Sequence, residues 1–423
     1  MSKILWIGDG GCTTGFGRVT HSIGDRLVER GHSVDVLAIN HRGDPFDTKV
    51  RLWMPTSRNR DDTYGFRRVV ELLNEIRPDV VVLLNDPQIV HRYLFENGYD
   101  PMKMLLRHPI IWYVPIDGYN LPSLWQEDFL ATTPIAMSKH GQDQIPNARL
   151  VYHGVDTEKY WPVSSQRPIR IGDFVARTKK ECKEAVGLPP DAFVVGRVDR
   201  NSGRKDYAAL WKALQPVMKR HSDVIAYFHC RGKDERSGTN LEALFTRDMD
   251  TMKQFRLPAP DQFDPVHGFP EEWLNILYNA FDVFASTSRG EGFGLTIAEA
   301  LACGVPVIAQ NVSSIPEVVG PGGELIDPQR EITVPFGQDQ WLADIGAFSE
   351  AIEHAYNSRG WRREKGKAGR DHVARTFQWD AAADKFHEYA EVLAHGNDSA
   401  GARGDGGADP DGVGAAGGGA AAS

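Results

Sequence analysis

Runs of consecutive apolar residues alternate along the chain with segments of helical periodicity. Phe16–Arg30 repeats its apolar residues at helical spacing and stops at Gly31, and Val69–Ile76 stops at Arg77-Pro78. Strands that are apolar on both faces, with helices between them, indicate parallel sheets covered on both sides. The predicted strands are Ile4–Ile7, Val34–Ile39, Val80–Leu84, Ile110–Val114, Ile135–Met137, Val194–Val198, Val224–Phe228, Val283–Ala285, Val305–Ala309 and Gly323–Ile326.

The repeated alternation predicts an α/β protein with two doubly wound, Rossmann-like parallel-sheet domains. We expect them over residues 1–165 and 166–378, facing across a cleft at the carboxyl ends of both sheets. The polar, helix-prone segment Pro162–Asp191 is expected to lead across the hinge. Residues 396–423 are rich in glycine and alanine, with one large apolar residue, Val413. That tail cannot bury enough surface to offset its ordering entropy, so we expect it to be disordered.

Ser288–Ala309 joins a glycine-rich turn to an apolar helix that carries two acids. Glu291 precedes the helix, and Glu299 lies about 12 Å further along its axis. Gly292 and Gly294 let backbone N–H groups approach a ligand, and a helix N-terminus favours an anion such as a diphosphate. A carboxylate among apolar neighbours, as at Glu299, is either buried against a partner or part of a site. Two acceptors flanking an anion site suit a nucleotide-sugar.

This stretch closely resembles the E-x7-E signature of the GT-B-fold retaining glycosyltransferases of family 4. The resemblance extends over nearly the whole chain ahead of the tail. The other segments that carry it are the N-terminal glycine-rich turn with Arg30–Val34, Val151–Asp156, Val194–Lys205, Gly268–Ser288 and Phe377–Asp380. It implies that a last helix, about residues 379–395, crosses back onto the first domain.

The resemblance also implies roles for particular residues. Glu291 would hold sugar hydroxyls, and Glu299 the ribose. Arg200 and Lys205, with the usual spacing of five, would neutralise the leaving nucleotide, and Arg197 is the competing assignment for the arginine. The remaining donor-binding residues are the backbone and helix start at Gly292, Phe293, Gly294 and Leu295, the facing turn at Gly15 and Gly17, and His229 at the end of a second-domain strand. Donor base selection would involve Val266–Phe269.

The acceptor side departs from the family. A histidine often follows the fourth strand there, whereas this chain continues with Asp117-Gly118. Asp117 is a candidate base for the acceptor hydroxyl, a partner for a sugar hydroxyl, or a residue of an Asp-Gly turn. Asn85-Asp86 after the third strand offers a weaker candidate of the same kind.

Other chemistries fit less well. In Gly8–Arg18, Phe16 stands where a P-loop needs lysine, and Thr13 breaks the G-x-G-x-x-G spacing. Asp248-Met249-Asp250 has a D-x-D form but lies in a charged stretch, Glu242–Phe255, predicted to be helical. Four scattered cysteines give no zinc spacing. We therefore expect no metal site and no cofactor beyond the nucleoside diphosphate sugar, which is the donor substrate.

Composition and charge indicate the compartment in which we expect the protein. The net charge is −9, 41% of residues are hydrophobic, and no apolar run is long enough to cross a membrane. The scattered cysteines and the absence of a signal-peptide pattern predict a cytoplasmic protein. Between Arg42 and Arg68 the sequence contains seven basic residues and four acids. This segment is either a solvated loop or an anion-binding surface.

The sequence thus predicts a hexosyltransferase (EC 2.4) that uses a UDP- or GDP-linked sugar and an acceptor hydroxyl on a glycan, glycoconjugate or protein. The basic segment motivates a second hypothesis, transfer to hydroxylated bases of viral DNA. The same motifs would also occur in a catalytically silent nucleotide-sugar-binding protein or in a phosphorylase running in reverse. Donor base, donor sugar and acceptor are not encoded in patterns that can be read directly.

Overall fold

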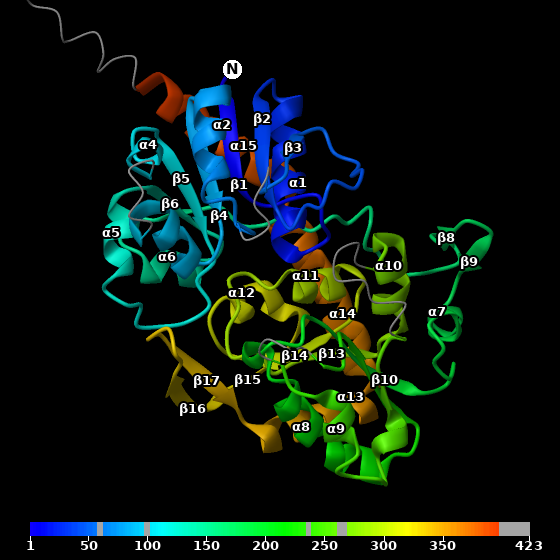
Figure 1. Ribbon diagram of the computed structural model, residues 1–423. Helices are drawn as coiled ribbons and strands as arrows, with labels where there is room; N and C mark the ends of the chain where they lie inside the picture. The colour runs from blue at the N-terminus through cyan, green and yellow to red at the C-terminus, as the bar shows by residue number, and fades with distance from the viewer. Residues whose placement is uncertain (57–61, 97–101, 234–237, 260–268, 397–423) are drawn as a thin grey trace, which may run out of the picture.

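The computed structural model describes residues 1–56, 62–96, 102–233, 238–259 and 269–396. Two α/β domains lie one above the other, each built around a parallel sheet (Figure 1). The predicted tail and part of the base-selection segment, residues 266–268, lie outside the described residues. Both sheets have helices on their two faces, as the sequence predicts for strands that are apolar on both sides.

The first sheet has seven parallel strands in the order β3-β2-β1-β4-β5-β6-β7. The chain reverses its direction of winding between β1 and β4, so the carboxyl ends of these two strands form the crevice where such sheets bind ligands. The strands are β1 Lys3–Asp9, β2 Ser33–Ile39, β3 Arg51–Trp53, β4 Val80–Leu84, β5 Ile110–Val114, β6 Thr133–Ala136 and β7 Arg149–Leu150. The helices are α1 Gly15–Glu29, α2 Arg68–Ile76, α3 Pro87–His91, which continues into a π-helical turn over Arg92–Glu96, α4 Met102–Leu105, α5 Trp125–Leu130 and α6 Lys139–Gln144.

The second sheet has six parallel strands in the matching order β12-β11-β10-β13-β14-β15. Its equivalent reversal lies between β10 and β13. The strands are β10 Phe193–Val198, β11 Val224–His229, β12 Phe255–Arg256, β13 Val283–Ser286, β14 Val307–Gln310 and β15 Gly323–Ile326. The helices are α7 Lys179–Ala185, α8 Tyr207–Arg220, α9 Leu241–Phe245, α10 Glu271–Ala280, α11 Leu295–Ala302, α12 Ile315–Val319, α13 Ile345–Asn357 and α14 Arg359–Thr376.

Local sequence explains where the two helices nearest the cleft begin. The Thr14 side chain accepts from Gly17 N at 3.0 Å and caps α1. Asp9, at the end of β1, fixes this turn by accepting from the Thr14 hydroxyl at 2.6 Å. Gly294 precedes α11 with a φ of 102°, a conformation that other residues rarely adopt.

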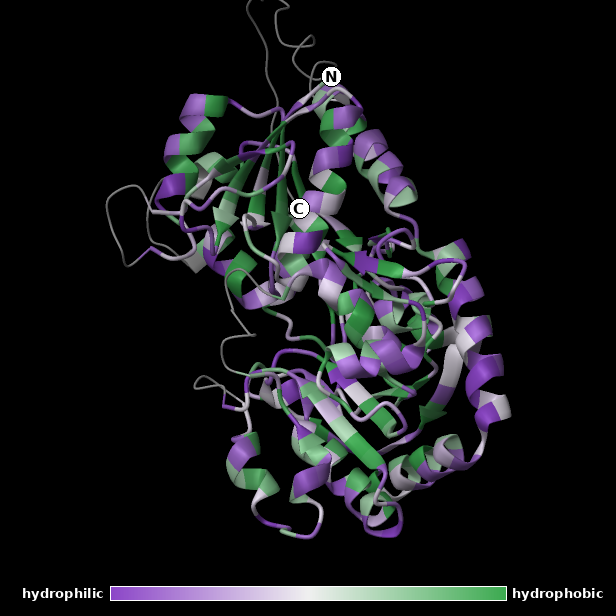
Figure 2. Cartoon of the chain, turned by 90° about the vertical axis from the view of Figure 1, so that its right-hand side faces the viewer, coloured by the Kyte–Doolittle hydropathy of each residue, from purple (hydrophilic) through white to green (hydrophobic). Residues whose placement is uncertain are grey.

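The hydrophobic core follows the strands. In Figure 2 the strands of both sheets are mostly hydrophobic, whereas the covering helices alternate hydrophobic and hydrophilic residues. Every residue of β4, β5, β10 and β11 is buried. Predominantly apolar strands of this kind are the signal that made both sheets predictable from the sequence.

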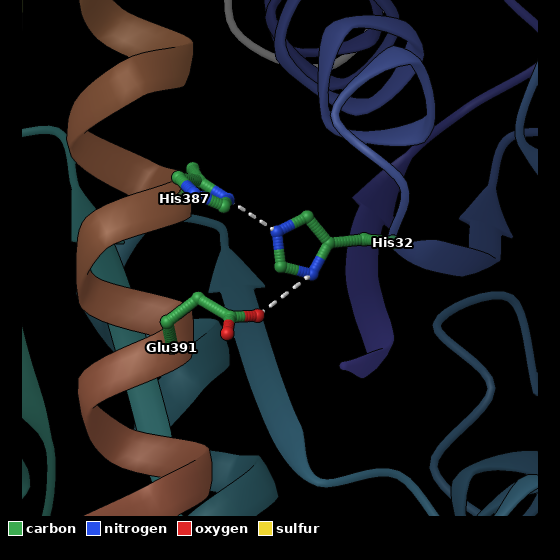
Figure 3. Close-up of side chains that lie close together, drawn as sticks. All are labelled: His32, His387 and Glu391. Carbon is green, nitrogen blue, oxygen red and sulfur yellow. Dashed lines mark hydrogen bonds and ion pairs between the residues drawn. The ribbon is translucent and has the colours of Figure 1, made fainter. Parts of the chain in front are cut away.

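The final helix, α15 Trp379–Gly396, leaves the second domain and packs on α1 of the first (Figure 1). Phe386 packs against Trp6, and Arg30 donates to Asp384 at 2.6 Å. Figure 3 shows a further contact between α15 and the first domain, in which His32 and His387 face each other beside Glu391. The two ring nitrogens are 2.7 Å apart. The chain therefore joins the domains twice, once after β7 and once before α15.

Three regions differ from the sequence prediction. The segment 162–191 contains a hairpin, β8 Ile169–Ile171 and β9 Phe174–Ala176, before α7 begins at a capping box made by Thr178 and Glu181. The stretch 242–255 is not one helix, because α9 ends at Phe245 and Asp248 and Asp250 lie in the turns beyond it. A further hairpin, β16 Pro328–Thr333 and β17 Asp339–Ala343, extends from the second domain.

None of the helices in the described parts of the chain combines the length and the apolar character that crossing a bilayer requires.

Candidate functional site

Glu291 is buried at the turn ahead of α11, and two cations converge on it. Lys205 Nζ lies 2.7 Å from Glu291 Oε1, and Arg204 Nη1 lies 3.1 Å from Oε2. Lys205 also pairs with Asp199 Oδ1 at 2.5 Å. Both cations belong to the turn that follows β10, so the carboxyl ends of β10 and β13 bring these charges together.

The charge state of Glu291 follows from this cluster. Burial disfavours its charged form, but the ammonium of Lys205 and the guanidinium of Arg204 outweigh burial and hold its pKa at about 2. Glu291 is therefore an anion throughout the neutral range. Its backbone N–H donates to Ser313 Oγ at 2.8 Å, which fixes the turn.

Glu299 lies on α11 and is 2% exposed. Its Oε1 is ion-paired with Arg18 Nη1, and its Oε2 accepts from the Tyr278 hydroxyl at 2.7 Å. Burial raises the pKa of Glu299, and the charge of Arg18 and the Tyr278 hydrogen bond oppose that rise. Glu299 is thus buried against partners, one of which comes from the other domain.

The arginine assigned by spacing is not the one beside Glu291. Arg200 is exposed at the turn, whereas Arg204 contacts Glu291. Arg197, the competing assignment, is fully buried within β10, where its guanidinium lies over the Tyr207 ring and donates to Thr287 Oγ1 at 2.9 Å. Sequence reasoning missed Arg204, because a fixed spacing from Lys205 does not reveal which basic side chain of a tight turn points inward.

The predicted glycines play different parts. A Cβ on Gly15 would meet only Leu295 of α11, at 3.9 Å, so the helix starts of α1 and α11 face each other with little between them. A Cβ on Gly17 would lie 2.5 Å from Cys12 O, so packing within its own turn requires that glycine. Gly292 packs over Pro115 of the first domain, where a Cβ would come within 3.0 Å of the proline Cβ.

Two predicted donor-binding side chains are buried in packing. Phe293 lies in an aromatic cluster with His153 and Phe377 at the junction of the domains. His229, at the end of β11, lies edge-on to Phe269 at 4.6 Å between ring centroids, and burial lowers its pKa to about 4. Leu295 is half-buried at the start of α11.

Asp117 lies at the carboxyl edge of the first sheet and is held from the second domain. Arg204 Nε lies 2.8 Å from Asp117 Oδ2, and Gln338 Nε2 donates to Oδ1 at 3.0 Å. Asp86 is close enough for the charge of Asp117 to act on it; burial first, and then that charge, raise the pKa of Asp86 to about 6. With Asp9, these carboxylates make the first-domain face of the cleft acidic.

The cleft is closed along this edge. The backbones of Tyr119 and Asp339, at the tip of the β16–β17 hairpin, exchange hydrogen bonds of 2.9 Å. The carboxylate of Glu317 on α12 accepts from Lys139 N at 2.9 Å, at the start of α6, and from the Tyr152 hydroxyl at 2.7 Å. First-domain groups thus pair with second-domain groups on both sides of Arg204.

Among the described residues, one group has metal-ligand side chains close together: His32, His387 and Glu391 lie with ligand atoms within 4.8 Å of one another. Their atoms already pair, because His32 Nε2 faces His387 Nδ1 (Figure 3). Ser2 N donates to His32 Nδ1 at 3.2 Å. They lie at the α15 junction and account for the attachment of that helix to the first domain.

The fold and this geometry have known counterparts. Residues 189–357 match the family model of glycosyl transferases group 1. Residues 189–357 are thus similar to the group 1 glycosyl transferases. The match spans β10, the cations at Arg204 and Lys205, and α11 with both glutamates, so it agrees with the family resemblance predicted from the sequence for this part of the chain.

Curated relatives agree with this group 1 assignment. A D-inositol 3-phosphate glycosyltransferase from Corynebacterium jeikeium is 27% identical over 250 residues, covering 58% of this chain and 52% of that protein. One from Segniliparus rotundus is 30% identical over 235 residues, covering 55% and 47%. The chain thus spans about half the length of the curated relatives it matches.

Solved structures show the same two-domain architecture. Sucrose-phosphate synthase from Thermosynechococcus elongatus superposes with a TM-score of 0.68 at 19% identity, covering 93% of this chain and all of that one. Anabaena HepE in complex with UDP and glucose gives a TM-score of 0.66 at 17% identity, with the same coverage. The predicted pair of doubly wound domains, the GT-B fold, is confirmed.

The basic segment is largely engaged where it is described. Arg51 lies 3.7 Å from Asp35, Arg68 is ion-paired with Glu71, and both guanidinium groups lie over the Trp53 ring. Residues 57–61, including Arg58 and Arg60, lie outside the described residues. The described contacts favour the interpretation as a solvated loop over an anion-binding surface.

Proposed function

We propose that this chain is a retaining hexosyltransferase, which moves a hexose from a UDP- or GDP-linked donor to an acceptor hydroxyl. The observation that carries the proposal is the convergence of Lys205 and Arg204 on Glu291, next to the start of α11. Helix N-termini and fixed cations bind diphosphates, and here the two cations lie beside the turn that precedes α11. HepE, which shares the fold, was solved with UDP-glucose.

In this proposal the diphosphate lies at the start of α11, with Lys205 and Arg204 beside it. The bond between the sugar C1 and the phosphate oxygen breaks, and its electron pair leaves with the nucleoside diphosphate. Preorganised cations stabilise the negative charge that develops there, the type of interaction that most often dominates catalysis. The acceptor oxygen bonds to C1 from the same face, and its proton passes to the departing phosphate.

Glu291 takes the sugar hydroxyls in this arrangement, because an ionised carboxylate accepts hydrogen bonds at both oxygens. Glu299 takes the ribose hydroxyls. Asp117 and Asp86 lie on the acceptor side, where the pKa of about 6 leaves Asp86 able to gain or lose a proton near neutral pH. The acceptor itself is not indicated by these residues, and a glycan, glycoconjugate or protein remains our expectation.

A thermal-shift screen tests the donor half. The panel contains UDP, GDP, UDP-glucose and GDP-mannose. A ligand that binds only the folded state raises stability by about 2.7 kcal/mol at one hundred times its Kd, so the true donor should raise Tm clearly. Lys205→Ala should lose that shift in Tm, and it should still unfold cooperatively in the absence of ligand. Lys219→Ala should keep the shift, because Lys219 pairs with Asp248 at the surface.

Two further results would decide against the proposal. The first is the absence of a Tm shift with every nucleotide in the panel. The second is binding without any release of hexose, either to water or to an acceptor extract, which would indicate the silent binding protein instead. Binding to duplex DNA at low salt, lost as salt rises, would support the nucleic-acid hypothesis.

A further inference from the structure

The cation that neutralises Glu299 comes from the opposite domain. Arg18 belongs to the first turns of α1, in the first domain, directly after Gly15 and Gly17. Its Nη1 pairs with Glu299 Oε1, and its Nε lies 3.2 Å from Glu271 Oε1. Glu271 and Glu299 both belong to the second domain, so Arg18 spans the cleft.

The described contacts of Glu299 leave part of its hydrogen-bonding capacity unused. A carboxylate offers about four lone-pair positions on two oxygens. Arg18 takes one position on Oε1, and the Tyr278 hydroxyl takes one on Oε2. One position remains on each oxygen, so the carboxylate can accept from two neighbouring hydroxyls while it stays paired with Arg18 in the donor complex that we propose.

Without Arg18 the same carboxylate would be in an unfavourable position. Its side chain is 3% exposed, and a buried charge without a counter-ion is costly. The titratable groups around it give little other help, since Glu271 is itself negative and paired with Lys159 at 2.6 Å. The groups that face Glu299 are Arg18 of α1, Tyr160 of the segment joining the domains, Glu271 and Tyr278 of α10, and Cys303 after α11.

We propose that Arg18 is a positioning residue, which keeps Glu299 ionised and oriented for the ribose of the donor, so that the donor site is complete only when the first domain closes on the second. The inference rests on the proposed function. The inference goes beyond that function, because it makes donor affinity depend on a residue of the first domain. Because linkage is reciprocal, donor binding then stabilises the closed arrangement by the same factor.

Binding of UDP and GDP by calorimetry, at about pH 6 and about pH 8, tests this coupling. Three variants are compared with the wild type. Arg18→Gln removes the charge, Arg18→Lys keeps it, and Arg26→Gln is the matched control, because Arg26 is on the same helix but pairs with Asp380 at the surface.

At the higher pH, we expect Arg18→Gln to bind the preferred nucleotide about tenfold more weakly than wild type does. At the lower pH, where Glu299 gains a proton in this variant, we expect its affinity to fall several-fold further. Wild type and Arg26→Gln should bind equally at both values, and Arg18→Lys should regain part of the affinity. Binding by Arg18→Gln within about twofold of wild type at both values would overturn the inference. An equal loss at both values that Arg18→Lys does not repair would also overturn it, because that is the result of a merely structural role.

Small-angle scattering of the ligand-free proteins tests closure separately. Arg18→Gln should have a larger radius of gyration than wild type and Arg26→Gln; equal radii would contradict the claim that Arg18 holds the domains closed. Failure of the proposed function is distinguishable, because it is seen in the wild type alone, as the absence of binding to any nucleotide. A wild type that binds normally beside an unchanged Arg18→Gln overturns only the inference.

Discussion

Glu291 and Glu299 are both buried carboxylates of one turn and its helix, yet they are neutralised in different ways. Glu291 is paired with Lys205 and Arg204, which belong to its own domain. Glu299 is paired with Arg18, whose helix belongs to the other domain. The pKa of Glu291 falls to about 2, whereas that of Glu299 rises. In the donor site that we propose, the half around Glu291 is therefore formed within one domain, whereas the half around Glu299 needs a residue of the other domain.

The largest effect is expected from Lys205→Ala, which leaves the half around Glu291 with Arg204 alone. Removing one fixed donor at a site of developing charge costs about 10²–10³-fold in rate, and we expect a loss of that size in kcat/KM for transfer. Steady-state kinetics with the donor found in the thermal-shift screen measure it. Lys219→Ala serves as the matched control, and a loss below about threefold for Lys205→Ala would contradict the assignment.

Gly290→Ala separates the two halves by obstructing closure. A Cβ at this position would lie 1.7 Å from the backbone oxygen of Asp117 in the first domain. We expect transfer to fall about 10- to 100-fold because the reacting groups are misplaced. Lys205 and Arg204 should stay on Glu291, so the second domain should keep its stability.

The matched control is Gly360→Ala, where a Cβ on helix α14 would meet nothing within 4 Å. Transfer by this variant should equal that of the wild type. Equal transfer by Gly290→Ala as well would mean that the closed contact at Asp117 is not needed for the reaction, and would remove the distinction between the two glutamates.

The pH dependence of stability should differ in sign. The folded pKa of Glu291 is lowered from 4.5 to about 2, so its contribution is present above about pH 4.5 and is lost as the pH falls toward 2. The folded pKa of Glu299 is raised, so its contribution is present below about pH 4.5 and is lost as the pH rises through the raised value.

Denaturant unfolding of Glu291→Gln and Glu299→Gln between about pH 3.5 and 7 measures this difference. The gap between wild type and Glu291→Gln should widen as the pH rises from about 3.5 to about 4.5 and then stay constant. The gap for Glu299→Gln should narrow instead. Two gaps that change in the same direction would show that the carboxylates share one environment.

The smallest effect is expected from Arg26→Gln. Arg26 joins α1 to α15 through Asp380, whose side chain is 72% exposed. Exposed ion pairs contribute about 0–1 kcal/mol, and the free energy of unfolding should change by no more than that. A change above about 2 kcal/mol would mean that surface pairs, and not only the buried pair at Glu299, hold the domains together.

The sequence predicts much of this molecule for a physical reason. A strand buried on both faces, such as β4 or β5, is apolar throughout, and that pattern stands out in the chain. The short edge strands β3, β7 and β12 have two or three residues each and carry no such pattern. The β8–β9 hairpin lies in a polar segment whose periodicity resembles a helix, so tertiary packing against α10 decided its structure.

Some residues of the candidate site can likewise be predicted from the sequence, and others cannot. The two glutamates are visible because acids in an apolar helix are unusual, and the turn cations are visible as a basic cluster. Arg18 gives no local signal, since it is 281 positions from its partner. Arg204 is one of four basic residues within nine positions, and only the fold of the turn selects it. The roles of these residues in catalysis stay predictions.

The two connections between the domains run side by side. Val155 N donates to Phe377 O at 3.1 Å, His153 stacks on Trp379, and a Cβ on Gly154 would lie 2.2 Å from Trp379 N. Two adjacent pivots allow rotation about one line and resist twisting or sliding about the others. Rotation about that line would separate Asp117 from Gly290 while the two connecting segments stay in contact with each other.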